Sequence, residues 1–139
     1  MIRAVIDTNV YVAALLSRDG APARIVQALA DGLVDPIVCP QLLSELSGVL
    51  ARPKIARHVA PDVALAYVAW LERTAVVMPD PPHVRRHTPD PDDDYIVALA
   101  HRSGAQVIVS GDAHILGLSA EATRVLSPAA FAEVVDGLR

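Results

Sequence analysis

The chain opens with MIRAVIDTNV, residues 1–10, and this stretch decides the expected fold. Residues 2–6 form a nearly continuous apolar run, which is typical of a central strand of a parallel sheet, buried on both faces. Asp7 follows this run directly, and sites in such sheets lie outside the carboxyl ends of the strands. The run is too short, and too soon broken by an acid, to be a signal peptide. The opening therefore predicts an α/β fold with Asp7 at the edge where a site would form.

Strands and helices are expected to alternate along the rest of the chain. Further strands are predicted at residues 35–39, 76–78, 106–109 and 125–126. Helices are predicted at residues 10–16, 22–31, 40–52, 61–73, 93–103 and 128–135, with short helical turns at 54–59 and 115–116 and a proline-rich loop at 79–91. This alternation indicates a three-layer α/β/α architecture around a central, mostly parallel sheet.

Length and composition favour one globular domain over residues 1–139. Hydrophobic residues make up 53% of the chain and the mean hydropathy is +0.36, which excludes a disordered chain. The net charge of −4 argues against a broadly basic nucleic-acid-binding protein, although a site built from acids lowers the charge by itself. The single Cys39 fits a reducing compartment, and no apolar stretch is long enough to span a bilayer. We therefore expect a cytoplasmic protein without a membrane partner, in which Cys39 is a small buried hydrophobe.

Three carboxylates stand where an acid is out of place. Asp7 and Asp112 follow predicted strands, and Glu45 lies in the apolar stripe of its helix with Leu42 and Leu46. Each has an ordinary explanation: Asp7 as a helix cap, Glu45 as an edge residue that reaches solvent, and Asp112 as part of a turn. However, carboxylates that the fold brings together repel one another unless they share protons or bind a divalent cation.

An acidic run, DPDDD at residues 90–94, leads into the predicted helix at 93–103. A helix dipole accounts for one or two acids at this place, whereas four repel one another and a nearby metal would relieve that repulsion. From the residues alone, the acid that points inward is either Asp93 or Asp94. The chain contains no HExxH, CxxC, Walker, GxGxxG or GxSxG sequence. The acids therefore indicate a metal-dependent hydrolase, best explained as a nuclease.

The acidic blocks, taken in order, resemble those of the PIN-domain ribonucleases, and more narrowly the VapC-type toxins of bacterial toxin–antitoxin systems. The similar segments are DTNV at 7–10, PQLLSEL at 40–46 with RPK at 52–54, the run at 90–100, VSGD at 109–112, and LSPAAF at 126–131. Any one block is weak evidence, but four in order at this spacing are specific and cover nearly the whole chain.

The resemblance implies an endoribonuclease that uses Mg²⁺ or Mn²⁺, held by four acids, which are Asp7, Glu45, Asp93 and Asp112. Asp93 is chosen over Asp94 because the family's acid is followed by Ile, Ala and Ala at the spacing of residues 96, 98 and 100. Hard carboxylate oxygens suit these ions, which activate a water for in-line attack. The products would carry a 5′-phosphate and a 3′-hydroxyl. A homodimer and an antitoxin protein whose segment fills the groove are also implied.

Asn9 and Ser110 are expected to position the RNA substrate, the Ser110 hydroxyl by holding a water or a phosphate oxygen. Two departures from the family stand out: Ser110 replaces a common Thr but keeps the hydroxyl, and His114 replaces a common acid. Two basic groups are candidates for phosphate contacts, although plain solubility explains them equally well. These groups are Arg52, Lys54, Arg57 and His58, and Arg85, Arg86 and His87. Tyr67 and Trp70 suit either an interface or core packing.

Two other functions stay open. A phosphatase of the haloacid dehalogenase type also has an Asp after its first strand, but that chemistry usually needs a second Asp two residues later, where this chain has Asn9. A non-catalytic PIN-like module that only holds a partner is the other alternative, and the presence of all four acids argues against it.

Overall fold

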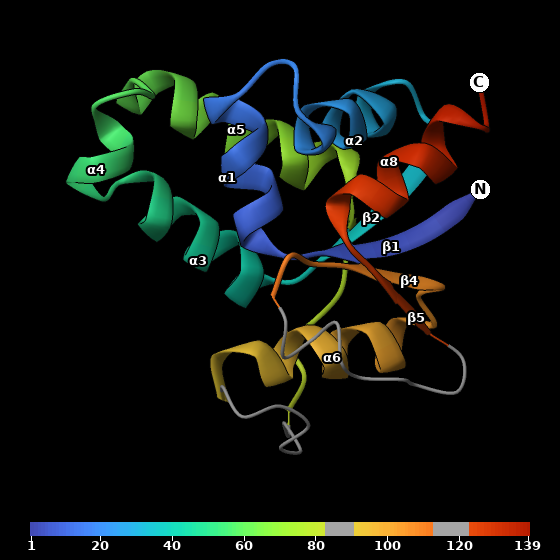
Figure 1. Ribbon diagram of the computed structural model, residues 1–139. Helices are drawn as coiled ribbons and strands as arrows, with labels where there is room; N and C mark the ends of the chain where they lie inside the picture. Colours follow the sequence, from blue (N-terminus) through green and yellow to red (C-terminus); the bar gives the residue numbers. More distant parts are fainter. Residues whose placement is uncertain (83–90, 113–122) are drawn as a thin grey trace.

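The computed structural model describes residues 1–82, 91–112 and 123–139, with the backbone alone for residues 91–94. Its centre is a parallel sheet with the strand order β3-β2-β1-β4-β5 (Figure 1). The strands are β1 (Ile2–Ile6), β2 (Val34–Val38), β3 (Val76–Val77), β4 (Val107–Val109) and β5 (Arg124–Leu126). All four neighbouring pairs are parallel, which confirms the predicted kind of sheet.

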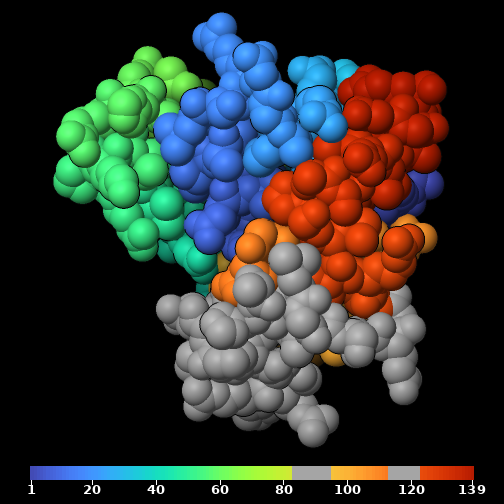
Figure 2. All heavy atoms as spheres, viewed as in Figure 1, coloured from blue at the N-terminus to red at the C-terminus, as the bar shows by residue number. Residues whose placement is uncertain are grey.

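Helices cover both faces of this sheet, so the three-layer α/β/α prediction is confirmed. Figure 1 shows α6 on one face and α1, α2, α3, α5 and α8 on the other. The helices are α1 (Thr8–Leu16), α2 (Ala21–Ala30), α3 (Pro40–Leu50), α4 (Pro53–Ala56), α5 (Pro61–Thr74), α6 (Pro91–Ser103) and α8 (Pro128–Asp136). In the space-filling view α1 lies between the α3–α5 region and α8 (Figure 2).

The predicted boundaries hold to within two residues, except that the turn predicted at 54–59 already ends at Ala56, and proline explains where several helices begin. α3, α4, α5, α6 and α8 all start at a proline, whose missing N–H has no partner to lose in the first turn. For this reason α6 begins at Pro91 and not at Asp93. Gly32 and Gly104 follow α2 and α6 with φ values of 76° and 68°, a left-handed conformation that glycine commonly adopts where a helix ends. The predicted turn at 115–116 and most of the loop at 79–91 lie outside the described residues.

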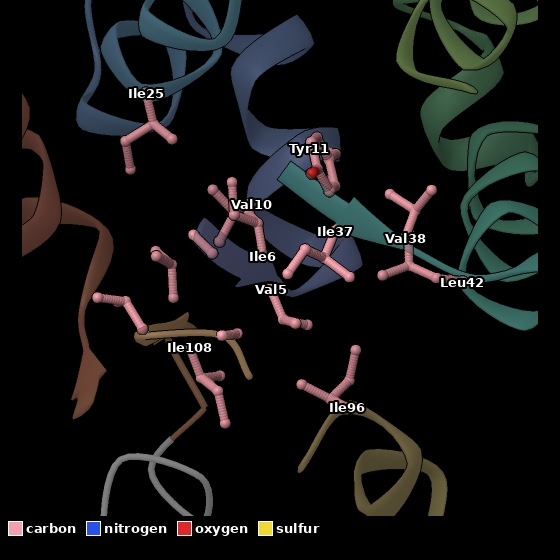
Figure 3. Close-up of a cluster of buried hydrophobic side chains, with 14 of the residues drawn as sticks. Val5, Ile6, Val10, Tyr11, Ile25, Ile37, Val38, Leu42, Ile96 and Ile108 are labelled. Atoms are coloured by element: carbon pink, nitrogen blue, oxygen red, sulfur yellow. The ribbon is translucent and has the colours of Figure 1, made fainter. Parts of the chain in front are cut away.

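The core lies on both sides of β1. Val5 is in register with Ile37 of β2 and Ile108 of β4, so these three side chains share one face of the sheet. Figure 3 shows Val5 and Ile108 on the side of Ile96 from α6, whereas Ile6 points toward the α1 layer. All five side chains are buried. This two-sided burial is the reason that residues 2–6 are apolar nearly throughout.

The aromatic and thiol side chains outside the acidic blocks pack into or against this core. Tyr67 and Trp70 stack with ring centroids 6.0 Å apart and lie partly buried against the core. The Tyr67 hydroxyl donates to the Tyr11 carbonyl oxygen at 2.8 Å. Cys39 is fully buried, and burial raises its pKa to about 11, which leaves a protonated and unreactive thiol as predicted. Across the described part of the chain, no helix is both long and apolar enough to cross a bilayer.

Topology selects one edge of the sheet for a site. The chain steps outward from β1 to β2 and β3, and then returns to place β4 on the opposite side of β1. The strand order thus reverses between β1 and β4, and the carboxyl ends of these two strands flank the point of reversal. In parallel α/β sheets, ligands bind in the crevice at such a point.

Candidate active site

Asp7 stands at this point of reversal, immediately after β1. Its backbone N–H donates to the Val109 carbonyl oxygen at 2.9 Å, which joins the ends of β1 and β4. The residue occupies the position before the first turn of α1, yet its carboxylate makes no capping hydrogen bond. The Asn9 backbone N–H still lowers the pKa of this carboxylate, so capping explains part of its setting and not the whole of it. Only 4% of Asp7 is exposed, so the carboxylate needs partners from the protein.

Two hydroxyl groups provide those partners. Ser110 donates to Oδ2 of Asp7 at 3.0 Å, and Thr8 lies 3.3 Å from Oδ1. The Ser110 hydroxyl oxygen also accepts a hydrogen bond from the Asp112 backbone N–H at 3.0 Å. Ser110 is itself fully buried and is positioned by a bond from its N–H to the Leu126 carbonyl oxygen. The sequence VSGD thus places Ser110 against Asp7 and turns the chain at Asp112, which is partly buried.

Glu45 reaches the same cluster from α3. The adjacent stripe residues Leu42 and Leu46 are fully buried, whereas Glu45 is partly buried. The Thr8 hydroxyl donates to Oε1 of Glu45 at 3.0 Å, so one hydroxyl connects the Glu45 and Asp7 carboxylates. Glu45 also lines an open depression of about 620 Å³, together with Pro40, Gln41, Ser44 and Asp80. A ligand in solvent therefore has access to the Glu45 side of the cluster.

Tyr95 completes the cluster from the opposite helix layer. Its hydroxyl donates to Oε2 of Glu45 at 2.6 Å, while its ring is 1% exposed. Burial raises the pKa of Tyr95 far above its usual value, so the phenol stays protonated and donates. A continuous path of hydrogen bonds thus joins Tyr95, Glu45, Thr8, Asp7 and Ser110.

Electrostatics at Asp7 reflects this crowded setting. Burial raises the pKa of Asp7, the negative charge of Glu45 adds to the rise, and the hydroxyls of Ser110 and Thr8 partly offset it. Two acids held this close are stabilised in their charged forms by a cation. The described residues that form this path of hydrogen bonds offer oxygen atoms and no sulfur or imidazole. Oxygen atoms are the ligands that Mg²⁺ and Mn²⁺ prefer.

Not every predicted site residue falls within the described side chains. The backbone of Asp93 lies in the first turns of α6, two residues before Tyr95, but its side chain and that of Asp94 lie outside the description. Among the described residues no three His, Cys, Asp or Glu side chains gather as a metal site. The structure therefore brings Asp7 and Glu45 together, with Asp112 at the next turn, and leaves the four-acid set as a prediction.

The predicted substrate-side residues are only partly described. Asn9 is exposed in the first turn of α1. Arg52, Lys54, Arg57 and His58 are exposed around α4, whereas the second basic group and His114 lie outside the described residues.

Sequence reasoning missed two members of the cluster. Thr8 belongs to the DTNV segment but is not among the predicted site residues, and Tyr95 is part of an apolar run at the start of a helix. A signal for Tyr95 did exist, because a tyrosine within a buried run usually needs a partner for its hydroxyl. Its partner could be found only once α3 and α6 were placed on opposite faces of the sheet.

Three comparisons bear on this site. The model of the PIN domain family matches residues 3–114, which spans every described member of the cluster. The chain is 25% identical over 120 residues to the uncharacterised protein MJ1680 of Methanocaldococcus jannaschii, covering 86% of this chain and 77% of that protein. The fold is similar to the crystal structure of PAE2754 from Pyrobaculum aerophilum, with a TM-score of 0.66 and 15% identity over 98% of this chain and 90% of that one.

PIN domains are in general nucleases that act on phosphodiester bonds, and this activity suits an acidic cluster at the carboxyl edge of a parallel sheet. The family match covers most of the chain, and the fold similarity extends over nearly all of it. The chain belongs to the PIN domain family.

Proposed function

We propose that this protein is a metal-dependent endoribonuclease and the toxin of a toxin–antitoxin pair. The observation that carries the proposal is the pairing of Asp7 and Glu45 through the Thr8 hydroxyl, at the reversal point of the sheet. Asp7, Glu45, Asp93 and Asp112 would hold Mg²⁺ or Mn²⁺. When bound, such an ion activates a water and stabilises the leaving oxygen of a phosphodiester.

The chain's own residues prepare this chemistry in three ways. Ser110 donates to Oδ2 of Asp7, and the single hydroxyl proton of Thr8 is shared between Oδ1 of Asp7 and Oε1 of Glu45, which holds the two carboxylates in one relative orientation. Burial of Asp7 excludes bulk water from its inner side, while the open depression beside Glu45 leaves room for a substrate. The exposed basic residues around α4, Arg52, Lys54 and Arg57, are suited to hold RNA phosphates.

Cleavage of end-labelled single-stranded RNA tests the proposal. We expect cleavage with Mg²⁺ or Mn²⁺, with 5′-phosphate and 3′-hydroxyl products, and loss of cleavage in EDTA. Asp7→Asn should abolish it, whereas Asp62→Asn, which changes an exposed acid on α5, should not. Cleavage by the Asp7→Asn variant at the full rate would refute the site.

A small phosphomonoester serves as the competing substrate. Turnover of that compound without RNA cleavage would favour the haloacid-dehalogenase-like phosphatase. Absence of turnover together with absence of Mn²⁺ binding would favour a non-catalytic module.

The toxin role, an antitoxin partner and a homodimer belong to the same proposal and rest on the family resemblance. Production of the wild-type chain in a bacterial host should arrest growth, and Asp7→Asn should relieve the arrest. Equal arrest by both would separate the toxicity from the nuclease site. Sedimentation of the purified chain as a monomer at micromolar concentration would contradict the homodimer.

A further inference from the structure

Tyr95 connects the two helix layers. It belongs to α6 and is buried, but its hydroxyl donates a hydrogen bond to Glu45 of α3, on the other face of the sheet. α6 packs on β1, β2 and β4 from the face opposite α3 (Figure 1). The Tyr95 hydroxyl passes the carboxyl edge of the sheet and donates to Oε2 of Glu45 at 2.6 Å. This hydrogen bond therefore links the two helix layers at the acidic cluster itself.

We propose that Tyr95 is a positioning residue for the nuclease reaction, which holds the Glu45 carboxylate in the orientation that a divalent cation requires. The inference rests on the proposed function, since it concerns the same acidic cluster. It adds a residue that binds neither cation nor substrate and acts through Glu45.

The geometry of Glu45 explains why such a residue is needed. A glutamate has three side-chain torsions, and partly buried Glu45 borders an open depression into which it could turn. Thr8 holds Oε1 at 3.0 Å and Tyr95 holds Oε2 at 2.6 Å, so both oxygens are fixed. Each carboxylate oxygen accepts about two hydrogen bonds. With one hydrogen bond to each oxygen from the described residues, each oxygen keeps acceptor capacity for a cation.

Tyr95 is suited to this role by its own rigidity. A phenol ring has two torsions, and a ring that is 1% exposed has its position set by packing. The tyrosine hydroxyl stands at the far end of the ring, so it extends further from the α6 backbone than the hydroxyl of a serine or threonine would. In metal sites generally, removal of a hydrogen bond to a ligand weakens metal affinity about 10–100-fold.

The test is calorimetric titration of Mn²⁺ into the wild-type protein and three variants at one pH. Tyr95→Phe removes the hydroxyl and keeps the ring. Tyr67→Phe is the matched control, because it too removes one hydrogen bond of a tyrosine hydroxyl. Tyr67 is partly buried and donates to the Tyr11 carbonyl oxygen. Glu45→Gln reports how far binding depends on Glu45. Thermal unfolding of each metal-free protein measures the structural cost of each change.

We expect Mn²⁺ affinity to fall at least about 10-fold in Tyr95→Phe and to change less than about two-fold in Tyr67→Phe. If Tyr95→Phe binds Mn²⁺ within two-fold of wild type while Glu45→Gln weakens binding, the role of Tyr95 is overturned and the proposed function is not. Equal weakening in Tyr95→Phe and Tyr67→Phe would also overturn the role of Tyr95, since the effect would then be structural. A wild-type protein without Glu45-dependent binding would overturn the metal site and the inference together.

A measurement on the wild-type protein covers the case in which Tyr95→Phe does not fold. A cation that draws electron density from Glu45 weakens the hydrogen bond from Tyr95, so Mn²⁺ should produce a tyrosine difference spectrum in the near ultraviolet. The signal should persist in Tyr67→Phe. Saturation with Mn²⁺ without any tyrosine signal would overturn the inference.

Discussion

Replacement of Ser110 by alanine removes a hydroxyl that makes two buried hydrogen bonds at once. The hydroxyl donates to Oδ2 of Asp7 and accepts from the Asp112 backbone N–H, each at 3.0 Å. The side chain is fully buried, so water has no direct route to replace it. The Asp7 carboxylate would lose one of its two hydroxyl partners, and the turn at Asp112 would lose an anchor.

The expected cost follows from these two bonds. A hydrogen bond to a charged group contributes about 1.5–3 kcal/mol to stability and one between neutral groups about 0.5–1.5 kcal/mol. We therefore expect Ser110→Ala to lower the free energy of unfolding by about 2–4 kcal/mol. For a chain of this length that corresponds to a decrease in Tm of roughly 3–4 °C per kcal/mol.

Urea unfolding in EDTA measures this cost without a contribution from bound cations. Ser103→Ala is the matched control: this buried serine makes a single bond to the Ala100 carbonyl oxygen at 3.2 Å. Its loss should cost about 1 kcal/mol or less, because alanine also favours the helix. The reasoning is refuted if the two variants have the same stability within about 0.5 kcal/mol, because the bond counts predict a difference of at least about 1 kcal/mol.

Three further outcomes are expected. Asp7→Asn should stabilise the metal-free protein at neutral pH, because burial raises the folded-state pKa of Asp7 and wild-type stability is lost as pH rises through that pKa. This gain in unfolding free energy should vanish below the ordinary Asp pKa of 3.8. Urea unfolding at several pH values measures it, and an Asp7→Asn variant that is less stable than wild type at neutral pH would contradict the prediction. Glu45→Gln should weaken Mn²⁺ binding by about 10-fold or more in calorimetry, and an unchanged affinity would remove Glu45 from the site. Tyr11→Phe should leave the unfolding free energy unchanged or raise it by about 1 kcal/mol, since the Tyr11 hydroxyl is buried with no hydrogen-bond partner among the described residues. A loss above about 1 kcal/mol in thermal unfolding would show that this hydroxyl has a partner.

The fold was predictable because its signals are local. Apolar runs mark β1 and β4, prolines mark the first turns of six of the described helices, and Gly32 and Gly104 mark helix ends. Each signal works through the backbone of a few neighbouring residues. Small errors in the boundaries, such as the start of α6 at Pro91, come from the tolerance of a first helical turn for proline.

The acidic cluster was predictable only in its charged members. Asp7 and Glu45 conflict with their apolar surroundings, and that conflict is visible in the sequence. Thr8 and Tyr95 raise no conflict, because a threonine at a helix start and a tyrosine in an apolar run are ordinary. Their roles come from contacts between residues 37 and 50 positions apart, which no local pattern contains.

The central position of β1 also determines when the cluster can exist during synthesis. β1 is made before both of its neighbours, β2 and β4, and Asp7 and Ser110 are 103 residues apart. At translation rates of about 5–20 residues per second, on the order of 5–20 s separate the two halves of the cluster. During that interval Asp7 lacks both the strand and the serine that orient it. The complete cluster therefore forms only after β4 has been synthesised.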